Sequence, residues 1–113
     1  MDTGDLLPAL KAVAEPTRLR MLELLTGWEG PRTGPVRTGE PGLCLSDLEL
    51  MVGLPHPLVS HHLRILKEAR IVESEKRGRW TVYRARPELL AQLAWQLAEL
   101  AGLHHSGPGS RAA

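Results

Sequence analysis

Residues 52–84 read VGLPHPLVSHHLRILKEARIVESEKRGRWTVYR, and this stretch decides the fold. Its first half predicts a helix, because Pro55 and Pro57 suit a helix start and apolar residues recur at helical spacing as far as Ala69. The apolar side consists of Leu58, Val59, Leu63, Ile65 and Leu66. Two strands are expected next, at 71–77 and 80–85, because β-branched and aromatic residues flank Gly78.

A shorter helix is expected just before this stretch. Ser46 and Glu49 have the S-x-x-E spacing of a capping box, apolar residues follow them, and Gly53 marks the end of the helix. A short helix, a tight Gly turn, a second helix and a hairpin are, in this order, typical of a winged helix-turn-helix. That fold presents its second helix, here called the recognition helix, to the major groove of DNA.

Helices are also expected at both ends of the chain. A first helix ends near Glu15, and a second begins at Pro16 and ends at Gly27. The predicted buried side of the second helix is Leu19, Leu22, Leu24 and Leu25. The last helix, ELLAQLAWQLAELAGL, repeats Leu at alternating steps of three and four, which is typical of a narrow coiled-coil seam. The predicted fold class is therefore mainly α (α+β), with about five helices and a two-stranded β wing.

The length of 113 residues allows one domain, which we place at 1–103. The segment 27–42 is rich in Gly and Pro and has no periodicity, so it is expected to be a long mobile loop. Trp28 is expected to pack back on the preceding helix, with contact to a partner protein as the less favoured alternative. Residues 104–113 are expected to be a disordered tail.

Basic residues are concentrated in one part of the chain. The net charge is only +1, yet eight of the fourteen Lys and Arg residues lie between Ser60 and Arg86, against three acidic residues, a local excess of 8 − 3 = +5. Such a segment in a near-neutral chain indicates a phosphate-facing surface. The alternative is a solvated helix face followed by an exposed hairpin.

Four phrases resemble the ArsR/SmtB family of bacterial winged-helix regulators. They are ALKAVAEPTRLRMLELL, LCLSDLELMVGL, LVSHHLRILKEARIV and RGRWTVYRA, and together they span residues 9–85 in the family's order. The resemblance implies a homodimer whose interface is formed by the first and last helices, at residues 5–15 and 88–103. The interface candidates are Leu6, Leu10, Leu90, Leu93, Leu97 and Leu100. The chain departs from the family at Arg70, where relatives usually carry Gly, and in its longer 27–42 loop.

The predicted function is sequence-specific binding of an inverted-repeat DNA operator, with consequences for transcription. The side chains expected near base edges are His56, Ser60, His61 and Arg64. Those expected on phosphates are Lys67, Lys76, Arg77 and Arg79. His62 is expected nearer the base of the helix. An alternative from another class is a winged-helix module that binds protein instead of DNA.

The family's metal sites are incomplete here. Relatives that sense soft metals carry Cys-x-Cys, whereas this chain has Cys44, Leu45 and Ser46. The last helix has no His, and only His104 and His105, just after it, resemble the family's nickel and cobalt branch. We therefore expect no evident cofactor, weak nickel binding at most, and DNA binding without metal. The signal is then expected from a partner protein at the loop or tail, with direct nickel or cobalt sensing as the alternative.

Other classes of protein are disfavoured. No nucleophile, acid and base are spaced for catalysis, and no Gly-rich phosphate loop joins a strand to a helix, so we expect no enzyme. The chain has one cysteine, no charged leader and no apolar run near the roughly 18 residues of a membrane span. These features predict a cytoplasmic protein without a membrane partner.

Overall fold

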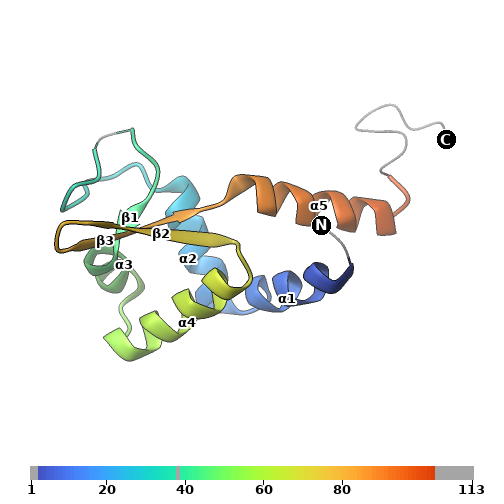
Figure 1. Cartoon of the computed structure of the whole chain (residues 1–113), viewed down its shortest axis with the longest axis horizontal. Coiled ribbons are helices and arrows are strands. Elements are labelled where there is room, and N and C mark those ends of the chain that lie inside the picture. Colours follow the sequence, from blue (N-terminus) through green and yellow to red (C-terminus); the bar gives the residue numbers. More distant parts are fainter. Residues whose placement is uncertain (1–2, 38, 104–113) are drawn as a thin grey trace.

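The computed structural model describes residues 3–37 and 39–103, which form five helices and three strands. Their order confirms the predicted winged helix-turn-helix and its mainly α composition (Figure 1). The elements are α1 (Thr3–Val13), α2 (Pro16–Gly27), β1 (Leu43–Cys44), α3 (Leu45–Val52), α4 (His56–Glu68), β2 (Val72–Arg77), β3 (Trp80–Ala85) and α5 (Pro87–Leu100).

The sheet has three strands, so the prediction of a two-stranded wing is incomplete. The strand order is β1-β3-β2 with antiparallel pairing, and Leu43 pairs with Tyr83. The pairing of β2 with β3 runs from Val72 opposite Ala85 to Arg77 opposite Trp80. Because β1 has only two residues, its sequence carries no period-2 signal. Its pairing with β3 alone defines it as a strand.

The core lies where α4 packs against α1, α2, α3 and β2. Leu48, Leu63, Leu66 and Ile71 are fully buried there. The predicted buried side of α2 is wrong at one position, because Leu19 is 50% exposed and Met21 is fully buried instead.

Two leucines predicted on apolar faces lie at the surface of the protomer. Leu19 lines a shallow groove with Val13, Leu90 and Leu93, so it faces the space between α2 and α5. Leu58, predicted on the apolar side of α4, is exposed near the start of that helix. Periodicity places both residues next to a buried face, but no neighbouring element of the described protomer covers them.

The predicted capping box is absent. The N-cap of α3 is Cys44, so Ser46 already lies inside the first turn and its hydroxyl oxygen lies 3.2 Å from Cys44 Sγ. The Glu49 carboxylate instead contacts Nδ1 of His56 across the helix-turn-helix turn. The turn itself ends α3 at Gly53, whose φ is +74°.

Arg70 adopts the left-handed conformation that the family's Gly would favour. Its φ is +66°, and the Ile71 amide donates to the Leu66 carbonyl at 3.0 Å while the Arg70 amide donates to the Lys67 carbonyl at 2.9 Å. This is the Schellman arrangement that ends a helix. A non-Gly residue there costs about 1 kcal/mol, but α4 still passes directly into β2.

The molecule is elongated, with extents of 52 × 27 × 23 Å. The hairpin of β2 and β3 lies at one end, and α1 and α5 extend toward the other (Figure 1). The leucine seam of α5 divides between two environments: Leu90 and Leu93 pack in the core, whereas Leu97 and Leu100 are exposed. None of the described helices is long and apolar enough to span a membrane.

The described residues of the loop between α2 and β1 form no helix or strand, as expected, but they make tertiary contacts. Trp28 packs on the core beside α2, as predicted, and its ring Nε1 donates to the Pro31 carbonyl at 3.1 Å. Val36, in the middle of the loop, is buried. The predicted mobility of this loop stays a prediction.

Candidate nucleic-acid interface

A polar stripe on α4 lies beside the sheet. Ser60, Arg64 and Lys67 are spaced i, i+4 and i+7, which places them on one side of the helix. They line one open hollow of about 410 Å³ together with Tyr83 of β3. The structure thus brings three predicted contact residues together between the recognition helix and the wing.

The two remaining base-edge candidates are linked to this stripe. Nε2 of His56 lies 3.4 Å from the Ser60 hydroxyl oxygen, and the contact of its Nδ1 with Glu49 fixes the ring at the start of α4. The Arg64 guanidinium lies 3.2 Å from Nδ1 of His61. His56, His61 and Arg64 are exposed, so their polar atoms are accessible to a ligand in a groove.

His62 has a different role from His61, as predicted. Its side chain is only 15% exposed, and its Nδ1 lies 3.1 Å from the Arg18 guanidinium and 3.3 Å from Glu15 Oε2. Because a guanidinium can only donate, Nδ1 of His62 is the acceptor of this bond. Burial lowers the pKa of His62, with the Glu15 carboxylate opposing that effect. His62 therefore fastens the middle of α4 to the junction of α1 and α2.

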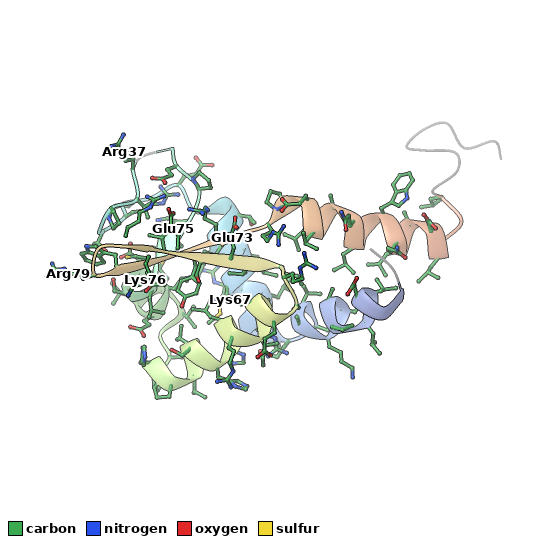
Figure 2. All side chains as sticks on the ribbon, in the orientation of Figure 1. Arg37, Lys67, Glu73, Glu75, Lys76 and Arg79 are labelled. Carbon is green, nitrogen blue, oxygen red and sulfur yellow. The ribbon has the colours of Figure 1, made fainter. Side chains whose placement is uncertain are left out.

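The hairpin presents two exposed cations. Arg79 lies at its tip and Lys76 lies along β2 (Figure 2). Lys67 lies on α4, and in the same view Arg37 lies on the other side of the hairpin. The Arg79 guanidinium is 5.3 Å from the centroid of the Trp80 ring, a cation–π distance that favours a defined position for this cation.

Arg77 is held inside an ion-pair network. Its guanidinium pairs with the Glu40 carboxylate, donates to Glu75 at 3.0 Å and donates to the Pro35 carbonyl at 3.4 Å. The hydrogen bond to Glu40 is the main cause that raises the pKa of Arg77. The structure therefore separates Arg77 from Lys76 and Arg79, since its hydrogen-bonding groups are engaged within the chain.

Comparisons with known proteins assign this arrangement to a family. The model of the bacterial regulatory protein, arsR family, matches residues 37–74, which include α3 and α4. An HTH-type transcriptional regulator of Methanocaldococcus jannaschii is 38% identical over 74 residues, covering 65% of this chain and 68% of that protein. The transcriptional repressor SdpR of Bacillus subtilis is 30% identical over 88 residues, covering 77% of this chain and 83% of that protein. The chain belongs to the ArsR family.

A solved structure has the same fold as this chain. It is a homodimeric winged helix-turn-helix DNA-binding domain from Mycobacterium bovis, with a TM-score of 0.63 and 22% identity, covering 91% of this chain and 83% of that one. The family model and the two relatives confirm the family resemblance of the sequence. This ArsR-family chain is a transcriptional regulator and not an enzyme, as predicted.

The ion pairs of this ArsR-family protein were missed by sequence reasoning. Arg84 donates to Glu75 at 3.0 Å and lies 3.7 Å from Glu73, so the hairpin neutralises part of the local basic excess. Glu73 and Arg84 are directly opposed in the register, and the alternation of charge would have indicated that pair. The pairing of Glu40 with Arg77 has no such signal, because 37 residues separate them.

No group of three His, Cys, Asp or Glu side chains within 3–37 and 39–103 is arranged to hold a metal ion. Cys44 is buried, with its Sγ 3.4 Å from the Thr33 hydroxyl oxygen and near Ser46. The weak nickel candidates His104 and His105 lie outside the described residues.

Proposed function

We propose that this ArsR-family regulator binds an inverted-repeat operator with α4 in the major groove and the hairpin of β2 and β3 along the phosphates. The observation that carries the proposal is the polar side of α4, where Ser60, His61 and Arg64 lie at the surface beside Lys67. Arg pairs with guanine edges in the major groove, and exposed Lys and Arg pair with phosphates. Lys76 and Arg79 supply the second set of cations from the hairpin.

The proposed binding unit is a homodimer. Leu97 and Leu100 leave an apolar surface at the end of α5, and Leu7 of α1 is also exposed. Both helices extend toward the same end of the molecule (Figure 1). Burying such a surface against a second copy stabilises association, and the Mycobacterium bovis domain with this fold is homodimeric. A two-fold axis would place two copies of α4 about 34 Å apart, one turn of duplex.

Operator binding is proposed to need no metal, with the signal supplied by a partner protein. Two features support this: the burial of Cys44 beside the hydroxyl groups of Thr33 and Ser46, and the lack of any histidine in α5. A cavity of about 750 Å³ between the loop, the hairpin and α5 is lined by Trp28 and Arg32, and it offers a place for a partner's side chain.

The same cavity favours a second candidate function, a winged-helix module that binds protein and not DNA. The ion pairs of Arg77 and Arg84 reduce the free positive charge of the hairpin and support this candidate. A mobility-shift titration against the DNA upstream of the chain's own coding region separates the two functions. No shift at micromolar protein would favour the protein-binding module.

Two substitutions test the assignment of roles within the interface. Arg64→Ala should change base preference by about 1–3 kcal/mol, because the variant cannot pair with guanine at one position of the operator. Arg79→Ala should weaken operator and random duplex equally and reduce the salt slope by about one unit, because one fewer phosphate is neutralised. Equal losses on both duplexes for both variants would contradict this assignment.

A further inference from the structure

The loop between α2 and β1 is attached to the helix-turn-helix by a buried carboxylate. Asp47 of α3 is only 6% exposed. Its two oxygens accept hydrogen bonds from the backbone amide and the hydroxyl of Thr33, both at 2.8 Å. Because two donors of one residue share one buried acceptor group, the position of Thr33 relative to α3 is fixed.

The same loop is attached to the hairpin a few residues later. Arg77 of β2 pairs with Glu40 and donates to the Pro35 carbonyl. Gly34 has a φ of +72°, and a Cβ built on it would lie 3.0 Å from the ring of Trp80 in β3. The loop backbone is therefore in close contact with the ring, and residues 33–37 together with Glu40 link α3 to the hairpin.

We propose that this segment, the brace, holds the hairpin at the angle that lets Lys76 and Arg79 contact phosphates while α4 lies in the groove. The inference rests on the proposed function. Lys76 precedes Arg77 in β2, and Trp80, beside the brace, follows Arg79. The brace therefore contacts Arg77 and Trp80, which adjoin the exposed cations Lys76 and Arg79. Glu40 is a positioning residue, because it acts on DNA binding through Arg77.

The ionisation of the pair fits a link that does not depend on pH near neutrality. The hydrogen bond from Arg77 lowers the pKa of Glu40 to about 2, so Glu40 remains ionised at any pH suited to DNA binding. Glu40 is also fixed locally, because its carboxylate accepts from the Arg37 amide at 3.0 Å while its own amide donates to the Arg37 carbonyl at 3.0 Å. A preorganised hairpin loses less conformational entropy on binding than a free one.

The first test compares Glu40→Gln with Glu29→Gln. Both changes remove one negative charge from the same loop, but Glu29 is exposed and lies near the start of the loop, outside the brace. We expect Glu40→Gln to bind operator about threefold to tenfold more weakly than Glu29→Gln, with a salt slope shallower by about one unit for each phosphate that the hairpin no longer reaches. Equal or tighter binding by Glu40→Gln would overturn the brace. Tighter binding would show instead that Glu40 masks the positive charge of Arg77.

The second test combines Glu40→Gln with Arg79→Ala. If the brace acts through the hairpin, the loss in the double variant is smaller than the product of the two single losses. Losses that multiply fully would overturn the inference. If Arg79→Ala alone leaves the salt slope unchanged, the proposed hairpin contact with DNA fails, and the brace fails with it. If Arg79→Ala has its expected effect on the salt slope but Glu40→Gln binds operator as well as Glu29→Gln, only the brace is refuted, and the proposed hairpin contact with DNA stands.

A readout without DNA completes the test. Amide hydrogen exchange in the hairpin, around Arg77 and Trp80, should be faster in Glu40→Gln than in Glu29→Gln, because a less restrained hairpin opens more often. Unchanged exchange would contradict the brace. Thermal unfolding of both variants identifies any global loss of the fold.

Discussion

Replacing Leu97 and Leu100 by Glu should convert the regulator into a monomer. The structure determines this choice of positions. Leu93 belongs to the same seam but is buried in the protomer, so Leu93→Glu would unfold the chain and say nothing about the dimer. Leu97 and Leu100 are exposed, and charged side chains at these positions leave the core intact.

The contribution of Leu97 and Leu100 to the stability of the dimer follows from the exposed fractions of their side chains. Leu100 is 76% exposed and Leu97 is 43% exposed, so together they leave slightly more than one leucine side chain in solvent. Burying one leucine contributes about 1.5–3 kcal/mol, so the two copies of this patch contribute about 4–7 kcal/mol to a two-fold dimer. Loss of that term corresponds to a rise in the dimer Kd of about 10³-fold to 10⁵-fold.

Sedimentation equilibrium over a range of protein concentrations measures this change. Leu50→Glu is the matched control, because Leu50 is 82% exposed on α3, far from α5 in the fold (Figure 1). We expect the control to remain dimeric at concentrations where the double variant is monomeric. A double variant whose dimer Kd stays within threefold of the unmodified chain would refute the assignment of this surface.

Two further predictions concern stability. Arg70→Gly should raise the free energy of unfolding by up to about 1 kcal/mol in urea titrations, because Gly relieves the left-handed backbone at that position; a loss of stability would show that the Arg70 side chain matters more. Burial lowers the pKa of His62 below its ordinary value of 6.5, so the unfolded chain binds that proton more readily, and stability should fall as pH drops below about 6.5. His62→Gln should flatten the fall below about pH 6.5, and an unchanged slope would exclude His62 as its source.

Local patterns in the sequence were sufficient to predict most of the fold. Pro16, Pro57, Gly53 and Gly78 mark element boundaries through their own backbone preferences, so the helices and the hairpin could be placed without tertiary information. β1 was missed because a two-residue strand is defined only by its partner. Leu19 was placed in the core because periodicity identifies an apolar face but not which part of that face a neighbour covers.

The sequence predicted the exposed side of α4 in the candidate site but not the ion pairs of the hairpin. The spacing of Ser60, His61 and Arg64 places them on the exposed side of α4 directly from the helical period. The separation of Arg77 from Lys76 was not predictable, because it depends on a carboxylate in a loop without periodicity. Folding brings that distant loop to the hairpin.

The most direct test of metal-free operator recognition is the affinity of the chelator-treated protein for DNA, measured as a function of salt concentration. The titration compares an inverted repeat from the region upstream of the coding sequence with a random duplex of equal length. We expect two protomers per operator, tighter binding to the inverted repeat by about 10³-fold or more, and a steep salt slope in the absence of metal. Equal affinity for both duplexes, or specific binding that appears only when nickel is added, would contradict metal-free recognition by α4 and the hairpin.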